Sequence, residues 1–179
     1  MPDSAYFAYG TTQSGFAHHR RLAHLLGEPV GRFRTESPHA VVVPRRPACS
    51  NPACRFDHRM AMLVAGFAPL RAEGDVFLVS AGALAAIDRL ETGPYVRDRV
   101  AVAALDGGDA VTAYAYFARS PARWRALVEA GAADALASYP RELAGDERLK
   151  ACCRRAPGHE PPHDVTDPLR RLVGRGSVP

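Results

Sequence analysis

Residues 95–118 read YVRDRVAVAALDGGDAVTAYAYFA, and no other part of the sequence has so clear a local pattern. Tyr95 to Ala103 alternates apolar and polar side chains, as a half-buried strand does, and Val111 to Ala118 is a second run of β-forming residues. Between them, residues 106–109 (DGGD) supply the aspartates and glycines of a tight turn. The stretch therefore predicts a β-hairpin.

The segments on either side of the hairpin predict further elements. Before it, Asp75 to Ser80 (DVFLVS) predicts a strand, and Ala81 to Leu90 predicts a short helix with one apolar face. After it, Ser120 followed by a proline is typical of a helix start, and we expect that helix to run to about Ala137.

The N-terminal half predicts a strand, a helix and two extended runs. Residues 5–9 are rich in aromatic side chains and end at Gly10, as a short buried strand would. Residues 14–26 have helical spacing of apolar side chains, with Ser14 as the expected N-cap. The extended runs are residues 30–47 and 60–67.

Strands joined by hairpins around a few helices indicate an α+β protein. We expect a small mixed, mostly antiparallel β-barrel with flanking helices and a helical or irregular C-terminal tail. Residues 1–120 are expected to form the barrel domain, and residues 121–179 a helix and an irregular extension packed on the same domain. Short helices are expected near 141–153 and 167–173. A chain of 179 residues with 47% hydrophobic content suits one such domain.

The composition argues against a membrane or nucleic-acid partner. No apolar run approaches the roughly 20 residues of a membrane helix, and the N-terminus lacks the order of a secretion signal, so we expect a cytoplasmic protein. The net charge of +4 comes from scattered arginines, because Lys150 is the only lysine. The sequence does not indicate an oligomeric state.

The loop after the first strand is the first candidate site. A strand that ends at Gly10 and continues through Thr11, Thr12 and Gln13 to Gly15, just before a helix, can point successive backbone N–H groups at one spot, which suits a carboxylate or an oxyanion. The same residues also fit a tight turn that needs only a positive φ at Gly10. They do not by themselves decide between the two interpretations.

Two carboxylates near the end of the second helix are the other candidates. Asp88 and Glu91 are three residues apart, so both can lie on one helix face, and a desolvated Glu91 would suit a general base. The alternative is that both pair with arginines at the surface, such as Arg89, Arg97 or Arg99.

Four segments follow one another as they do in a known family: YFAYGT at 6–11, GDVFLV at 74–79, LAAIDRLETGPYVRDRVAV at 84–102 and AYAYFA at 113–118. Together they resemble the γ-glutamylcyclotransferase family, including its AIG2-like branch. The first is similar to the family's Tyr-Gly-Ser/Thr loop, and the third to its pattern of Leu-Asp, Glu and then Tyr-Arg. The resemblance covers roughly residues 5–118.

The resemblance implies a reaction and a site. Glu91 falls on the family's catalytic glutamate, acting as general acid and base in an intramolecular aminolysis that releases 5-oxoproline and a free amine from a γ-glutamyl amide. It implies a small-molecule γ-glutamyl substrate and neither a cofactor nor a metal. The implied substrate-binding residues are Tyr6, Phe7, Ala8, Tyr9, Gly10, Thr11 and Tyr116.

The chain departs from the family pattern at two places. Thr12 stands where the family commonly has Leu or Asn, and Glu91 is followed by Thr92 and Gly93 where glycine often comes directly. Both bear on the shape of the pocket and so on the substrate. Residues 44–59 do not align with the pattern.

Cysteines and histidines leave a second function open, a non-catalytic binding or interaction module on the same barrel, with or without zinc. The Cys-x4-Cys spacing is wider than most zinc knuckles, and adjacent cysteines seldom both ligate, so reduced cysteines are favoured. Histidines 18, 19 and 24 are expected at the surface or core edge. The residues concerned are Cys49, Cys54, His58, Cys152, Cys153, His159, His163, His18, His19 and His24.

Overall fold

The described part of the chain contains eight strands and three short helices. The structure is a computed structural model that describes residues 4–45, 61–91 and 93–140. In chain order the elements are β1 (Ser4–Ala8), α1 (Ala17–Leu26), β2 (Gly31–Thr35), β3 (His39–Pro44), β4 (Met62–Ala65), β5 (Glu73–Val79), α2 (Ala81–Leu90), β6 (Tyr95–Ala104), β7 (Ala110–Ala118), α3 (Pro121–Glu129) and β8 (Ala133–Leu136).

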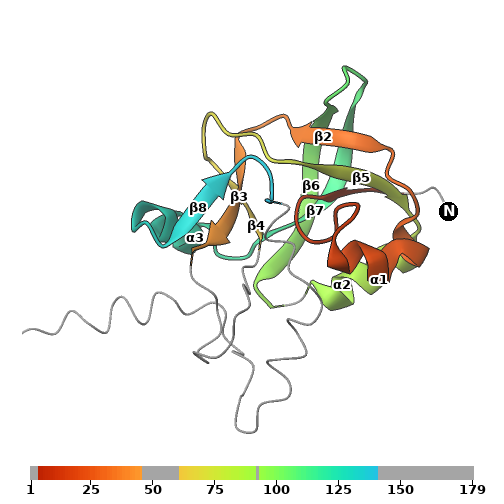
Figure 1. Ribbon diagram of the computed structural model, residues 1–179, viewed down its shortest axis with the longest axis horizontal. Coiled ribbons are helices and arrows are strands. Elements are labelled where there is room, and N and C mark those ends of the chain that lie inside the picture. Colours follow the sequence, from red (N-terminus) through yellow and green to blue (C-terminus); the bar gives the residue numbers. More distant parts are fainter. Residues whose placement is uncertain (1–3, 46–60, 92, 141–179) are drawn as a thin grey trace, which may run out of the picture.

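Five strands close into a barrel in the order β1-β5-β2-β6-β7, because β1 also pairs with β7 (Figure 1). The predicted hairpin is its largest unit, with β6 and β7 antiparallel from Tyr95↔Ala118 to Ala103↔Ala110. The β1–β7 and β4–β7 pairs are parallel and the other pairs are antiparallel. The predicted mixed, mostly antiparallel barrel is therefore confirmed.

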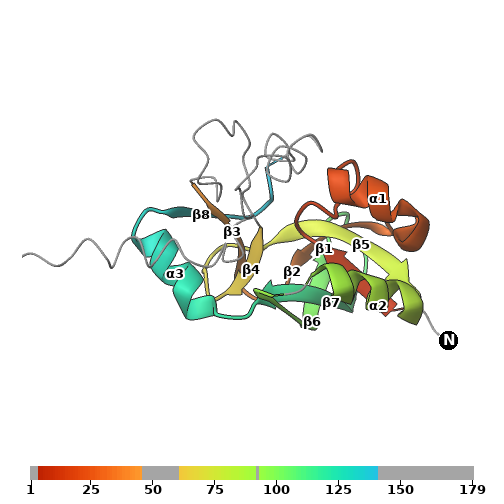
Figure 2. The same ribbon diagram turned by 90° about the horizontal axis from the view of Figure 1, so that it is seen from below.

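Three apolar clusters hold the layers together. Phe7, Val76 and Val102 belong to the cluster inside the barrel. A second cluster packs α1 and α2 against the outer side of β1 and β5, with Tyr6 and Phe77 among its members. The third packs α3 against β3, β4 and β8, at the end of the molecule away from α1 and α2 (Figure 2).

Two helix boundaries differ from the sequence prediction. The prediction that Ser14 caps the first helix is wrong, because α1 begins at Ala17 after Phe16 and the Ser14 N–H binds a side chain of β5 instead. The prediction that the third helix runs to Ala137 is also wrong. That helix ends at Glu129, Gly131 follows with a φ of 67°, and β8 then pairs with β3.

The second helix starts and ends near the predicted residues. The Ser80 hydroxyl accepts a hydrogen bond of 3.2 Å from the Ala83 N–H, which satisfies one of the donors at the start of α2. At the other end, the Glu91 N–H donates to the Ile87 carbonyl at 2.9 Å. Helix α2 therefore delivers Glu91 at its C-terminal end. The helices predicted near 141–153 and 167–173 lie outside the described residues.

Candidate functional site

The candidate site lies where strand β7 changes its partner. On the edge of β7 opposite β6, Tyr114 pairs with Tyr6 of β1, and Phe117 pairs with Leu63 of β4. Strand β1 ends at Ala8, and the chain turns away at Gly10. A Cβ at position 10 would lie 3.1 Å from the Ala61 Cβ, so this turn packs tightly against the residue that precedes β4.

Two tyrosine hydroxyls bind backbone carbonyls at this junction. The Tyr9 hydroxyl donates to the carbonyl of Tyr116, which lies between the β7 residues paired with β1 and with β4. The Tyr95 hydroxyl donates to the Ala61 carbonyl at 3.0 Å. Both bonds satisfy carbonyls close to the point where two parallel pairings meet. The hydroxyl of Tyr9 therefore has a structural partner.

The turn that follows β1, residues 10–15, begins with Gly10 and Thr11, the last two residues of the substrate-binding loop that the resemblance implies. The Gly10 carbonyl accepts hydrogen bonds from the Gln13 N–H at 3.1 Å and from Gln13 Nε2 at 3.2 Å. The Thr11 carbonyl accepts from the His19 N–H at 3.3 Å, which ties the loop to the first turn of α1. Positive φ occurs at Gly15, with a value of 84°, and not at Gly10 as the tight-turn interpretation required.

Side chains hold the same loop from both sides. The Tyr6 and Thr12 hydroxyls are 2.9 Å apart, and the Thr11 hydroxyl lies 2.7 Å from His18 Nδ1. Thr12 is buried. Each hydroxyl thus has a partner that fixes its rotamer, so the loop is held in one conformation.

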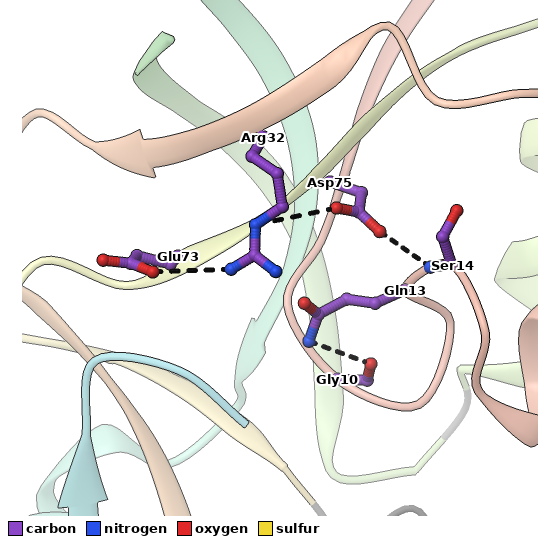
Figure 3. A network of polar contacts seen from close by, with 6 residues as sticks. All are labelled: Gly10, Gln13, Ser14, Arg32, Glu73 and Asp75. Atoms are coloured by element: carbon purple, nitrogen blue, oxygen red, sulfur yellow. Dashed lines mark hydrogen bonds and ion pairs between the residues drawn. The ribbon is translucent and has the colours of Figure 1, made fainter. Parts of the chain in front are cut away.

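A buried acidic side chain of β5 binds the far end of the loop. The Ser14 N–H donates to Asp75 Oδ2 at 2.7 Å, and Asp75 Oδ1 lies 3.9 Å from Arg32 Nε. Arg32 also contacts Glu73 at 3.4 Å. Figure 3 shows this network, with Gln13 turned back toward Gly10.

Glu91, the predicted catalytic residue, is half-buried and directly follows the last residue of α2. Burial raises the pKa of Tyr6, Tyr9 and Tyr95, and the nearby charge of Glu91 raises each of these pKa values further. The three phenols therefore stay protonated at neutral pH and remain hydrogen-bond donors near one carboxylate.

The partners of Asp88 are Tyr116 and an arginine at the surface. Its Oδ1 accepts a hydrogen bond of 2.8 Å from the Tyr116 hydroxyl, and its Oδ2 lies 2.5 Å from Arg97 Nη1. The surface-pairing alternative thus holds for Asp88. Burial raises the pKa of Tyr116, and the hydrogen bond to Asp88 raises it further. Tyr116 also packs edge-on against Tyr6, with ring centroids 6.0 Å apart.

The structure separates the predicted substrate-binding residues into two groups. Tyr6, Tyr9, Gly10 and Thr11 lie at the junction or in the loop, and Tyr116 contacts Tyr6. The side chains of Phe7 and Ala8 lie in the apolar clusters on either side of the barrel wall, and they are buried, as are Tyr6 and Tyr116.

Sequence reasoning missed Tyr95 and Tyr139 as neighbours of the site. Tyr139 is buried and packs on Phe16, with ring centroids 5.9 Å apart, and its charge would raise the pKa of Tyr95 further. Tyr95 could have been noticed as the aromatic residue that opens the strand after Glu91. No local signal marks Tyr139, because it follows a strand that was predicted as helix.

Only some of the histidines, and none of the cysteines, lie within the residues that the structure describes. His18 binds Thr11, the His19 ring packs on Phe77 at 5.5 Å, and His24 is exposed. The four cysteines and the other histidines of the zinc hypothesis lie outside the described residues. Within residues 4–45, 61–91 and 93–140, no group of three His, Cys, Asp or Glu residues could hold a metal ion. No helix in this part of the chain is long and apolar enough to cross a membrane.

Comparisons with solved structures identify the fold. An AIG2-like protein from Mus musculus matches with a TM-score of 0.58 and 22% identity, over 83% of this chain and 95% of that one. An uncharacterized protein from Homo sapiens matches with a TM-score of 0.51 and 17% identity, over 98% of this chain and 100% of that one. A comparison with curated proteins gave no match.

The five-stranded barrel with a glycine loop at its rim is thus the AIG2-like fold. The family model described as gamma-glutamyl cyclotransferase, AIG2-like, matches residues 6–133. The chain belongs to this family, which confirms the resemblance seen in the sequence. The family implies a small-molecule γ-glutamyl substrate.

Proposed function

We propose that the protein is a γ-glutamylcyclotransferase that converts a γ-glutamyl amide into 5-oxoproline and a free amine, with Glu91 as general acid and base. The observation that carries the proposal is the position of Glu91, whose charge acts on Tyr6, Tyr9 and Tyr95 at the rim where the glycine loop begins. A carboxylate placed at this rim can reach a small molecule held by the loop.

The reaction needs one proton carrier. Glu91 takes a proton from the α-ammonium group of the substrate, and the freed amine attacks the γ-carbonyl carbon. The tetrahedral intermediate collapses as the C–N bond to the leaving amine breaks. Glu91 returns its proton to that amine, and the second proton of the ring nitrogen passes to it as well, so the amine leaves as an ammonium ion. A five-membered ring is formed and the carboxylate is regenerated.

The tethered nucleophile explains why so little further machinery is required. An intramolecular amine attacks at an effective concentration of about 10⁵–10⁸ M when it is well oriented. Orientation is the role we propose for the loop, whose N–H groups at Gly10 and Thr11 would bind the oxyanion or the α-carboxylate. Neither N–H group has a backbone acceptor among the described residues.

The test is 5-oxoproline release from a panel of γ-glutamyl amino acids and γ-glutamyl amines, assayed by mass spectrometry. We expect the Glu91→Gln variant to lose at least about 100-fold in kcat while its unfolding temperature stays close to that of the wild type. The matched control is Glu129→Gln, since Glu129 also lies at a helix C-terminus, as the last residue of α3, but is exposed. Full activity in Glu91→Gln would refute the assigned base.

The panel also separates the proposal from the alternative of a non-catalytic binding module. A folded wild-type protein that releases no 5-oxoproline from any substrate would favour the binding module. Stoichiometric zinc in the purified protein, lost on Cys49→Ser, would then point to a metal-stabilised interaction surface.

A further inference from the structure

Asp75 occupies an unusual place for a carboxylate, the middle of a barrel strand. Its side chain is 7% exposed, and on β5 it alternates with Val76, which faces the barrel interior, and shares a face with Phe77 beneath α1. A buried carboxylate costs several kcal/mol unless charged or hydrogen-bonding partners compensate for the lost water. The identity of its partners therefore indicates what it does.

The stronger of its two described contacts is with the loop. The Ser14 N–H lies 2.7 Å from Asp75 Oδ2, within the range of a charge-assisted hydrogen bond, whereas Arg32 Nε is 3.9 Å from Oδ1. Arg32 is 41% exposed and also contacts Glu73, so its attraction is screened and shared. The carboxylate is thus committed chiefly to one backbone amide.

One residue holds both ends of the loop. The backbone of Asp75 pairs with Ala8, the last residue of β1, and its side chain binds Ser14, four residues beyond Gly10. Gly74 fixes this pairing closely, because a Cβ there would lie only 2.2 Å from the Ala8 carbonyl oxygen. The loop is therefore closed onto a rigid strand, and the turn at Gly10 has little freedom to reorient.

We infer that Asp75 is a positioning residue that holds the substrate loop, residues 10–15, in the conformation that presents its backbone N–H groups to the substrate. The inference rests on the proposed function for its effect on turnover. Its effect on the loop itself follows from the geometry alone, so the two can fail separately.

The first experiment measures the loop without substrate. In the full chain, hydrogen exchange of the Ser14 amide and of the peptide covering residues 10–16 is compared among wild type, Asp75→Asn and Asp75→Ala. We expect exchange of this peptide to rise roughly 10- to 100-fold in Asp75→Ala and less in Asp75→Asn, which keeps an acceptor for the Ser14 N–H. The matched control is Glu73→Gln, which removes a neighbouring carboxylate of β5 that also contacts Arg32; wild-type exchange is expected there.

The second experiment measures kcat and KM for the best γ-glutamyl substrate well below the unfolding temperature of each variant. A loop that has lost its position should lower kcat/KM by about 100-fold in Asp75→Ala and by a smaller factor in Asp75→Asn, with Glu73→Gln unchanged. Should Asp75→Ala fail to fold, Asp75→Asn of the same shape carries the comparison.

The outcomes are distinct. Wild-type exchange of residues 10–16 in a folded Asp75→Ala variant would overturn the positioning role, whatever the activity. Raised exchange in a protein that turns over no substrate would support the positioning role and count against the proposed function. Raised exchange with unchanged kcat/KM would overturn the link between the loop and the reaction.

Discussion

Tyr116 of β7 donates its hydroxyl hydrogen to Asp88 of α2, and the other oxygen of Asp88 binds Arg97 of β6. The pair joins the helix that ends in Glu91 to the hairpin. Asp88 side-chain exposure is 39% and that of Arg97 is 34%, so the ion pair itself contributes about 1 kcal/mol or less. The contacts of Asp88 matter chiefly because they fix the orientation of α2 relative to the hairpin.

The Asp88→Asn substitution should lower the pKa of Tyr116, because it removes a negative charge beside the phenol. That pKa should still remain above its ordinary value, because burial is the larger cause of the increase. Spectroscopic titration of the phenols measures the change, and Tyr116→Phe identifies which titration belongs to Tyr116. An unchanged titration in Asp88→Asn would contradict the hydrogen bond described here.

Buried phenols also predict an alkaline limit of stability. The pKa values of Tyr6 and Tyr9 are raised in the folded chain, and these residues are 2% and 6% exposed. Above a pH of about 10 the unfolded chain releases phenolic protons that the folded chain keeps. The free energy of unfolding should therefore fall as pH rises, by about 1.4 kcal/mol per pH unit for each such tyrosine. Below that pH these groups add no slope.

Urea unfolding between pH of about 9 and 12 checks this prediction. Tyr9→Phe should cost about 1 kcal/mol at neutral pH through the lost bond to the Tyr116 carbonyl, and it should flatten the alkaline slope by one tyrosine. Tyr114→Phe is the control, because the hydrogen bond from Arg99 lowers the pKa of Tyr114. Equal slopes in Tyr9→Phe and wild type would show that Tyr9 ionises in the folded state.

Gly74→Ala should be strongly destabilising. The added Cβ would overlap the Ala8 carbonyl oxygen at 2.2 Å, so β1 or β5 would have to move, and overpacking of this kind costs about 1–3 kcal/mol or more. Gly82→Ala in α2 is the matched control, since its Cβ would meet only the Ser80 hydroxyl at 3.8 Å and alanine favours a helix. Thermal unfolding of both variants tests this prediction. Equal unfolding temperatures of Gly74→Ala and wild type would contradict it.

The hydrogen bond between Tyr6 and Thr12 can be weighed by a double-mutant cycle. Tyr6→Phe and Thr12→Val each remove one of the two buried hydroxyls, which are 2.9 Å apart. We expect a coupling free energy of about 1 kcal/mol from chemical unfolding of the two single variants and the double variant. Strictly additive effects would mean that the two hydroxyls do not stabilise each other.

Elements with a strong local pattern were predictable from the sequence. The β6–β7 hairpin follows from alternation and a DGGD turn, and α2 follows from its apolar face. The two wrongly predicted helix boundaries lie where contacts with distant residues determine the structure. The Ser14 N–H binds Asp75, and residues 133–136 pair with β3 although they follow a helix directly. Tertiary contacts outweigh local propensity at both places.

The candidate site shows the same limit. Gly10 and Glu91 are recognisable because each ends an element and matches a family pattern. Asp75 gave no signal beyond a strand residue, and Tyr139 gave none, because their significance comes from partners far away in the chain. The hydrogen bond from the Tyr9 hydroxyl to the Tyr116 carbonyl was equally beyond the reach of the local sequence, because the two residues lie 107 positions apart.

The parallel contact between Tyr6 and Tyr114 also bears on how the chain is made. The two residues are separated by more than a hundred positions, so β5 leaves the ribosome, and can pair with β1, before β7 does. One edge of β1 then stays unpaired, with its backbone groups exposed, until the last strand of the barrel has emerged. Such a nascent chain closes its barrel only after synthesis of the hairpin is finished, and it is most exposed to edge-to-edge association during that interval.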